Sequence, residues 1–232
     1  MWPVVVLLAV ALLAGAAWLL HWLLIRTEGV FLGRRVVVWL YDLAAARYDA
    51  IKQYDPDTES AFVAWPLSRR LKGRPAPTVL DVATGTGRLP QFLLAEPTFH
   101  GRVVGLDASA GMLAQARAKL APFGGRVALV RATAGELPFA DAAFAAVTCL
   151  EALEFLPDDA AALREMVRVL RPGGVLLTTR RQGAEAPYFL GRARGREELE
   201  ALLTGLGLVE VRSTPWQVEY ELVWAAKDGD PG

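Results

Sequence analysis

Residues 79–89 read VLDVATGTGRL, and this stretch decides the fold of the chain. An apolar run leads into a glycine-rich turn, after which an apolar helical pattern begins, so the order predicts a buried strand, a sharp turn and a helix. Gly85 and Gly87 allow the backbone to turn tightly and to approach a ligand closely. A dinucleotide fingerprint needs a third glycine where Pro90 stands. The turn therefore favours close packing on a non-phosphate ligand over pyrophosphate binding.

Downstream, apolar strands alternate with helices. We expect strands at residues 78–82, 102–106, 127–131, 144–150 and 175–179, and helices at 89–95, 109–120 and 158–170. Asp158 is a suitable N-cap, and residues 172–174, Pro-Gly-Gly, are expected to end the helix that it begins. Continuous apolar strands separated by helices predict a parallel sheet with both faces covered.

The C-terminal pattern differs. A helix is expected at residues 197–204, and two strands at 208–212 and 219–225 are joined by a loop that contains Pro215. No helix fits between these strands, so they are expected to be antiparallel. The fold class is therefore α/β: a Rossmann-like, doubly wound, mostly parallel seven-stranded sheet with a terminal antiparallel hairpin.

Two further segments suit a nucleoside ligand. Asp107 closes the second strand, 22 residues after Gly85, where a carboxylate can accept both hydroxyls of a ribose. Its alternative role is the N-cap of the following helix, which Ser109 can supply instead. After the third strand, Thr133 and the amide of Ala134 offer polar partners beside an apolar slot, which an adenine ring requires.

Upstream, residues 4–25 contain no Asp, Glu, Lys or Arg. A helix of this length spans about 33 Å, close to the thickness of a bilayer's hydrocarbon core. Trp2 stands at one end and Trp18 and Trp22 near the other, where interfacial aromatic residues are expected, and His21 is interpreted as an interfacial residue. The segment is therefore predicted to be a transmembrane helix.

The flanking charges predict its orientation. Arg26, Arg34 and Arg35 follow the apolar run and no basic residue precedes it, so the chain after it is expected in the cytoplasm, with the protein a single-pass membrane protein. A cleaved signal peptide would need a basic start, a shorter apolar run and a cleavage site, for example near Gly15. A buried hairpin of a soluble protein is the third interpretation.

Residues 29–77 are expected to form a helical connector. The segment 36–54 carries apolar and aromatic residues on one helical face, and 62–71 reads as a second helix. That face contains Val37, Leu40, Tyr41, Ala44, Tyr48 and Ile51. The chain thus divides into an anchor (1–28), a connector or lid (29–77) and an α/β domain (78–232).

Composition excludes several classes of function. The 25 basic and 25 acidic residues balance, so no basic excess indicates nucleic-acid binding. Cys149 is the single cysteine, so no intramolecular disulfide is possible, and it is expected to pack in the core. With His21 and His100 as the two histidines, His-rich and most Cys/His metal sites are excluded, and no metal is expected.

Four segments, residues 80–87, 104–112, 135–144 and 168–177 (RVLRPGGVLL), resemble the class I S-adenosylmethionine-dependent methyltransferases. The likeness is to the type-11 branch, which includes the ubiquinone/menaquinone C-methyltransferases, and covers about residues 75–180. It implies S-adenosylmethionine as the cofactor. The implied binding residues are Asp81, Ala83, Gly85 and Gly87 for the methionine part, Asp107 for the ribose, Met112 beside the adenine, Thr133 and Ala134 at its edge, and Ala108.

The chain departs from that family at two places: Thr133 stands where an acid is frequent, and Ala145 where an aspartate is frequent. The pairs Tyr41-Asp42 and Tyr48-Asp49 are similar to the family's N-terminal lid segment. Because a sulfonium is already an activated electrophile, methyl transfer depends mainly on positioning. A base is needed only for some acceptors, and the candidates are Tyr41, Tyr48, Glu151, Glu154 and Tyr188.

The expected function is methylation of a small, membrane-soluble acceptor, such as a quinone precursor or a lipid. A tethered enzyme meets bilayer-embedded acceptors at high effective concentration. The alternatives are a catalytically silent cofactor-binding module on the same fold, or a nucleotide-cofactor oxidoreductase, which Pro90 disfavours. His100 precedes the second strand, at the end of the sheet opposite the cofactor turn, and is a poor catalytic candidate.

Overall fold

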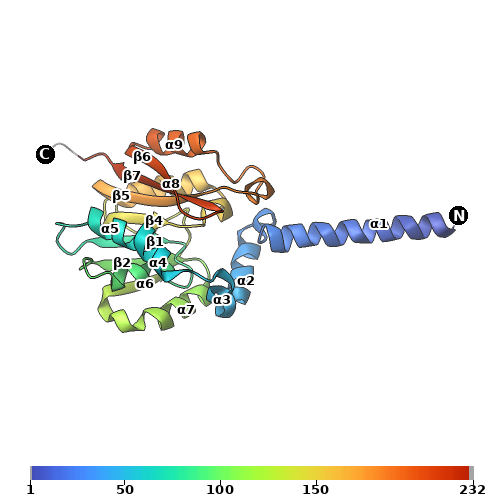
Figure 1. The fold of residues 1–232 in the computed structure, drawn as a ribbon, viewed down its shortest axis with the longest axis horizontal. Helices are drawn as coiled ribbons and strands as arrows, with labels where there is room; N and C mark the ends of the chain where they lie inside the picture. Colours follow the sequence, from blue (N-terminus) through green and yellow to red (C-terminus); the bar gives the residue numbers. More distant parts are fainter. Residues whose placement is uncertain (1, 230–232) are drawn as a thin grey trace.

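Seven strands form one sheet in the order β3-β2-β1-β4-β5-β7-β6 in the computed structural model, which describes residues 2–229 (Figure 1). The first five are parallel, and β7 pairs antiparallel with both β5 and β6. The strands are β1 Thr78–Val82, β2 Arg102–Asp107, β3 Val127–Arg131, β4 Phe144–Cys149, β5 Leu170–Arg181, β6 Leu208–Pro215 and β7 Tyr220–Lys227. The predicted mostly parallel sheet with a terminal antiparallel hairpin is confirmed.

Helices cover both faces of this sheet. The core on one face includes residues of α8 and α9, and the core on the other face includes residues of α5 and α6. The helices are α1 Trp2–His21, α2 Arg34–Ala44, α3 Tyr48–Lys52, α4 Pro56–Glu59, α5 Trp65–Arg70, α6 Arg88–Ala95, α7 Ala110–Leu120, α8 Asp159–Val169 and α9 Arg196–Gly205. The carboxyl ends of the parallel strands consequently meet at one edge, where ligands bind in doubly wound folds.

The apolar strands explain why the sheet is covered on both sides. Successive side chains of a strand point to opposite faces. Leu80 and Val82 of β1 therefore belong to the core that includes Met166 of α8, whereas Val79 belongs to the core that includes Leu93 of α6. Full burial of one such side chain is worth about 1.5–3 kcal/mol.

The structure corrects the predicted end of the helix that Asp158 caps. α8 ends at Val169, and β5 starts at Leu170, so residues 172–174 lie inside the strand rather than between helix and strand. Phe144 of β4 pairs with Leu170, but the next paired residues are Ala146 and Val175. The Pro-Gly-Gly segment is thus a bulge, a place in a strand where a proline without an N–H group is tolerated.

The connector is more broken than its periodicity predicted. The expected helix over 36–54 is divided into α2, a 3₁₀ turn at Ala45–Arg47 and α3, and it ends at Gln53 in the left-handed region (φ +48°). Pro56 begins α4, because the Asp55 carboxylate accepts a hydrogen bond from the amide of Asp57 and caps the new helix. The second predicted helix is present, as α5 preceded by a π-helical turn at Ser60–Ala64.

Part of the connector shares the core of the sheet. Val63, Leu67 and Leu71 are buried in the same cluster as Val79 and Leu93. Loss of these contacts would expose a face of the sheet as well as the connector. The second half of the connector therefore packs as one body with the α/β fold.

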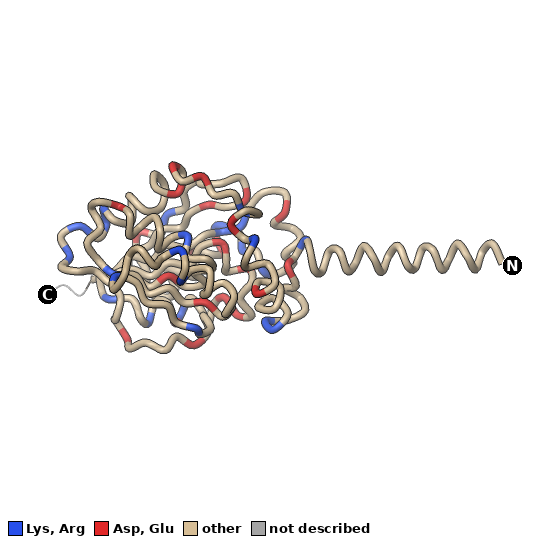
Figure 2. The backbone as a smooth tube through the Cα atoms, turned by 90° about the horizontal axis from the view of Figure 1, so that it is seen from below, with Lys and Arg blue, Asp and Glu red and all other residues tan. Residues whose placement is uncertain are grey.

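Helix α1 projects away from the rest of the chain (Figure 1), and all of its residues are exposed. Figure 2 shows no charged residue along it. Residues Trp2–Arg26 are long and apolar enough to cross a membrane, by length and composition. At its base the hydroxyl of buried Thr27 donates to the carbonyl of Trp22, whose ring stacks on Phe31 at a centroid distance of 5.1 Å.

Candidate functional site

The glycine-rich turn after β1 forms the floor of a cavity. Ala83, Gly85 and Gly87 all have positive φ, at +56°, +56° and +82°, which bends the chain sharply into α6. A Cβ atom added to Gly85 would meet nothing within 4 Å, so this glycine faces open space. A Cβ on Gly87 would lie 2.8 Å from Cδ1 of Leu120, so this glycine is required for packing against α7. The two glycines serve different purposes: ligand approach and helix packing.

Asp107 lies at the end of β2, beside that turn. Its Oδ2 accepts a hydrogen bond from the amide of Gly85 at 2.8 Å, and its Oδ1 accepts from the amide of Ser109 at 2.8 Å. Ser109 is the N-cap of α7, since its Oγ accepts from the amide of Met112 at 3.0 Å. Burial raises the pKa of Asp107 from its usual value, with the backbone bonds acting against that rise. The carboxylate retains lone pairs for a ligand's hydroxyl groups.

Asp81 is more deeply placed than a direct ligand contact requires. It is buried, and it accepts hydrogen bonds from the hydroxyls of Thr84 and Thr148, each at 2.7 Å. Burial raises its pKa to about 6 despite these bonds. It lines a small polar pocket together with Thr86 and Arg88 rather than the main cavity. Asp81 thus holds the turn in shape and reaches a ligand at that pocket alone.

The main cavity has a volume of ≈ 250 Å³. Of the predicted cofactor residues it is lined by Ala83, Gly85, Asp107, Ala108, Thr133 and Ala134. Gly87 and Met112 do not line it, and Met112, in the first turn of α7, is fully buried. Apolar atoms dominate the rest of the wall, through Leu106, Leu150 and Phe155.

These features fit an adenosyl cofactor. Gly85 leaves room where any other side chain would project, and Asp107 presents a carboxylate to the cavity. Thr133 and Ala134 also line this mainly apolar cavity. The carboxyl ends of β1, β2 and β3 supply all of these residues, so the doubly wound topology brings them together.

The connector forms the opposite wall, through Val37, Tyr41 and Tyr48. The aspartates that follow the two tyrosines bind the residues around the cavity. Asp42 accepts from the hydroxyl of Ser109 at 2.5 Å and from the amide of Gly111 at 2.8 Å. The repeated Tyr-Asp pair therefore has a physical meaning: the tyrosines cover the cavity and the aspartates fix the cover.

The second of these aspartates reaches the glycine-rich turn. Asp49 accepts from the hydroxyl of Thr86 at 2.6 Å and forms an ion pair with Lys119 of α7 at 2.5 Å. Lys119 also donates to the Thr86 hydroxyl at 2.9 Å. The connector is consequently attached on both sides of the cavity, at the start of α7 and at the turn before α6.

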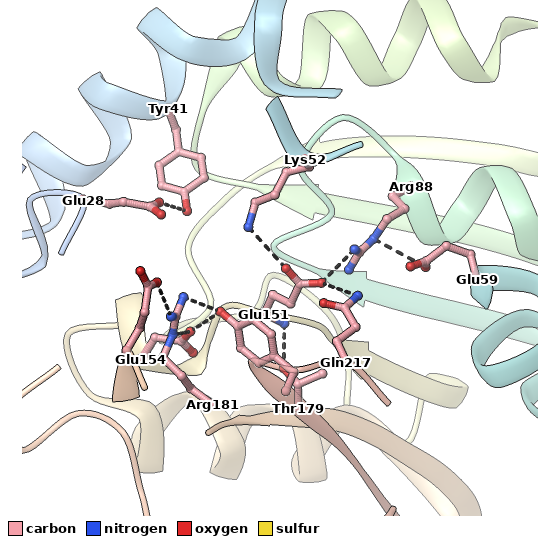
Figure 3. A network of polar contacts seen from close by, with 12 residues as sticks. Glu28, Tyr41, Lys52, Glu59, Arg88, Glu151, Glu154, Thr179, Arg181 and Gln217 are labelled. Atoms are coloured by element: carbon pink, nitrogen blue, oxygen red, sulfur yellow. Dashed lines mark hydrogen bonds and ion pairs between the residues drawn. The ribbon is translucent and has the colours of Figure 1, made fainter. Parts of the chain in front are cut away.

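Figure 3 shows a charged network at one side of the cavity, centred on Glu151. Glu151 follows β4 with φ +52°, and its carboxylate pairs with Arg88 at 2.7 Å and Lys52 at 3.3 Å. Burial alone would raise the pKa of Glu151, but Arg88 and Lys52 outweigh burial and hold it below its usual value. Such a carboxylate stays ionised and is a weak base. Arg88 also lies 3.6 Å from Glu59, and burial raises the pKa of Glu59 to about 7.

Sequence reasoning missed Arg88. Its guanidinium stacks over Tyr54 at 4.1 Å and lies 5.4 Å from the ring of Trp216, so it joins the connector to the β6–β7 loop. One signal was present: a cation at the first position of a helix is unfavourable for the helix dipole. An arginine placed there needs acidic partners from elsewhere in the fold.

The five acid–base candidates are not all brought together. Tyr41, Tyr48 and Glu151 line the cavity. Glu154 does not, because it is buried in a separate cluster where it accepts from Arg181 at 2.8 Å. Tyr188 also lies outside, with the guanidinium of Arg26 5.4 Å from its ring. His100 precedes β2 at the opposite end of the sheet, as expected, and Cys149 is fully buried in the core.

The comparisons with known proteins match this geometry. Residues 79–174 match a family described as a methyltransferase domain. The strand order and this match show that residues 79–174 are similar to a methyltransferase domain, which supports the class and the S-adenosylmethionine cofactor that the sequence predicted. The chain is 34% identical over 139 residues to a demethylmenaquinone methyltransferase of Symbiobacterium thermophilum, covering 58% of this chain and 55% of that one.

A second relative is the ubiquinone/menaquinone biosynthesis C-methyltransferase UbiE of Proteus mirabilis, 45% identical over 101 residues, covering 43% of this chain and 40% of that one. The chain thus spans about half the length of the curated relatives it matches, or less.

Solved structures agree on the fold. A SAM-dependent methyltransferase from Aquifex aeolicus superposes with a TM-score of 0.61 at 21% identity, covering 75% of this chain and 95% of that one. The [4+2]-cyclase SpnF superposes with a TM-score of 0.68 at 18% identity, covering 84% and 96%.

Proposed function

We propose that this protein transfers a methyl group from S-adenosylmethionine to a small, membrane-soluble acceptor, a quinone precursor or a lipid. The observation that carries the proposal is the mainly apolar cavity between the cofactor turn and the aromatic wall of the connector. Two relatives named as quinone-biosynthesis or demethylmenaquinone methyltransferases support an acceptor of this kind. An apolar helix at the N-terminus supports a bilayer-embedded acceptor.

Five of the predicted cofactor residues have positions that permit a role in binding. Asp107 would accept the ribose hydroxyls, and Thr133 and Ala134 would contact the adenine edge. Gly85 would let the backbone approach the methionine part, and Asp81 would act at the polar pocket beside it. When bound, S-adenosylmethionine supplies an activated methyl group.

The chain's own residues contribute mainly position and exclusion of water. Burial and the neighbouring Glu28 raise the pKa of Tyr41 well above its usual value, so its phenol stays protonated and donates to Glu28 at 2.7 Å. Burial raises the pKa of Tyr48 in the same way. Glu151 is ionised and held by two cations. None of these three is prepared to remove a proton, so we propose catalysis by orientation rather than by a strong general base.

We further propose that residues 1–28 anchor the protein as a single-pass transmembrane helix. Residues 29–77 would connect this anchor to the α/β domain and cover its cavity. Residues 78–232 would form the methyltransferase domain on the cytoplasmic side. Residues 1 and 230–232 of these divisions lie outside the described residues. The absence of charge over 4–25 and the arginines that follow it support this arrangement.

The test uses the full chain in lipid nanodiscs with S-adenosylmethionine labelled in its methyl group. Demethylmenaquinone and membrane-lipid extracts are supplied as acceptors, and mass spectrometry identifies the labelled product. A labelled quinone or lipid supports the proposal. If the protein binds S-adenosylhomocysteine but labels no acceptor from membrane extracts, the result favours the catalytically silent module. If it binds NAD more tightly than S-adenosylhomocysteine, the result favours the oxidoreductase.

Topology is tested separately, by protease digestion of sealed vesicles. The α/β domain should be digested from the cytoplasmic side with α1 still attached. Digestion from the opposite side alone, or a domain released by cleavage near Gly15, would contradict the anchor.

A further inference from the structure

Helix α2 has an outer face that no other element covers. Trp39 and Leu43 lie one turn apart on it and are 58% and 71% exposed. The inner face is different, since Val37 and Tyr41 line the cofactor cavity. A short helix with two such exposed apolar side chains on its solvent side gains free energy when that side meets an apolar phase.

The position of α2 identifies that phase. It lies on the side of the domain from which α1 leaves, and it runs across the end of α1 rather than along it (Figure 1). A helix that crosses the end of a membrane-spanning helix lies along the membrane surface. Trp39 is of the residue type that favours the boundary between headgroups and acyl chains.

Three arginines lie together near the start of α2. Arg34 and Arg35 at the start of α2 and Arg131 at the end of β3 line an open pocket of ≈ 380 Å³. Within residues 2–229 none of the three forms an ion pair with a carboxylate. The acid nearby, Asp42, is already bound by the Ser109 hydroxyl and the Gly111 amide, which lower its pKa, and the charge of Arg131 lowers it further without forming an ion pair. Guanidinium groups without acidic partners suit phosphate oxygens, which they bind through two parallel hydrogen bonds.

We propose that the outer face of α2 docks on a bilayer that contains anionic phospholipid. Trp39 and Leu43 enter the headgroup–acyl boundary, and the arginine pocket binds headgroup phosphates. This inference rests on the membrane anchoring in the proposed function. Apolar side chains alone would suit a protein partner, whereas apolar side chains beside unpaired arginines, continuous with a membrane-spanning helix, suit an anionic bilayer.

Docking of this face would serve catalysis directly. The helix that touches the lipid is the helix that forms the cavity wall, and Arg34 and Val38 line both the cavity and the arginine pocket. The cavity mouth would then open at the lipid surface. An acceptor dissolved in the bilayer would enter without crossing water.

The experiment places a fluorophore on the full chain in phospholipid vesicles. Cys149 is fully buried, so wild-type protein should take up no label, and Leu43→Cys introduces the reactive thiol. Ala201→Cys on α9, exposed and distant from α1 (Figure 1), is the matched control. A quencher attached to lipid headgroups should quench the label at position 43 strongly and the label at 201 weakly. Equal quenching at the two positions would overturn the proposal.

The charge arm uses the double variant Arg34→Gln/Arg35→Gln, with Arg102→Gln/Arg117→Gln as a control of equal charge loss at exposed arginines. One arginine near an anionic surface is worth about 1 kcal/mol, so removing two should shift the docking equilibrium on phosphatidylglycerol vesicles by roughly 30-fold. The control should shift it less than two-fold. Equal shifts of the docking equilibrium in both variants would contradict phosphate binding by the arginine pocket. Docking that does not depend on anionic lipid would contradict it as well.

Two further outcomes are distinguishable. If position 43 becomes shielded in lipid-free detergent as protein concentration rises, the face binds a second copy of the chain and the proposal fails. Methyl transfer to a detergent-solubilised acceptor is measured on the same protein. No methyl transfer together with quenching at position 43 would contradict the proposed function and leave docking intact. Methyl transfer without quenching at position 43 would contradict docking alone.

Discussion

Replacing Asp107 by asparagine tests the cofactor site most directly. The Asp107 carboxylate accepts from the amides of Gly85 and Ser109, each at 2.8 Å, and lies at the wall of the cavity. Asparagine keeps the shape and one acceptor but loses the charge and turns the second oxygen into a donor. One hydrogen bond between a charged group and a ribose hydroxyl is worth about 1.5–3 kcal/mol, so cofactor affinity should fall roughly ten- to a hundred-fold.

Asp107→Ala should do more than this. It removes the acceptor of both part-buried amides, at Gly85 and Ser109, which costs about 1–3 kcal/mol of folding free energy. The alanine variant should therefore lose more thermal stability than the asparagine variant, which keeps an acceptor for one of the two amides, while both variants lose affinity. The contrast separates the ribose contact from the structural contact.

Calorimetric titration of S-adenosylhomocysteine into the full chain in detergent measures the affinity. Ser109→Ala is the matched control, because it removes the N-cap of α7, at a cost of about 1 kcal/mol, and the hydrogen bond to Asp42 while leaving the Asp107 carboxylate in place. Wild-type affinity in Asp107→Asn would show that the ribose is held elsewhere. An equal loss in Ser109→Ala would mean that the affinity falls because α7 or the connector is loosened.

Three other changes have defined outcomes. Gly85→Ala places a Cβ in the cavity and should weaken cofactor binding, whereas Gly87→Ala meets Leu120 and should cost about 1–3 kcal/mol of stability in thermal unfolding. Glu59 has a pKa of about 7 when folded against an ordinary value of 4.5, so ionising it opposes folding. The contribution of Glu59 to the free energy of unfolding should fall by about 2–3 kcal/mol as pH rises from 5 to 8. Glu59→Gln should remove this pH dependence. Deleting residues 1–21 should leave cofactor affinity intact, because no side chain of residues 2–21 is buried, while turnover of a bilayer-embedded acceptor drops.

Each of these has a contrary result. Unchanged cofactor affinity in Gly85→Ala would show that the open space at Gly85 holds no part of the ligand. The same pH dependence of unfolding in wild type and Glu59→Gln would place the titrating group elsewhere. Loss of cofactor binding on removal of 1–21 would mean that α1 supports the fold, and unchanged turnover of a bilayer-embedded acceptor would separate the helix from the acceptor.

Much of the fold is readable from local pattern. The apolar runs of β1 and β4 are continuous because both faces of the sheet are covered, and Ser109 and Asp158 cap the helices that they precede. The cofactor residues at the ends of β1 to β3 follow from the same pattern, because parallel strands bring their carboxyl ends together.

Other features depend on contacts between distant segments. The bulge in β5 exists because Leu170 and Val175 both pair with β4 while the Pro-Gly-Gly between them cannot. The cavity position of Glu151 and the buried place of Glu154 differ although they are three residues apart. No local signal separates them, since what decides is whether Lys52 and Arg88 or Arg181 reaches the carboxylate.

Arg88 contacts three regions that are far apart in the sequence. They are represented by Glu59 of the connector, Glu151 after β4, and Trp216 between β6 and β7. Two of these regions lie outside the family match at residues 79–174. Removing any one would leave a buried cation short of a partner, so none can detach at little cost. The connector and the hairpin should therefore unfold in a single cooperative transition with the sheet. Their slowest amides should exchange with the same opening free energy, that of global unfolding.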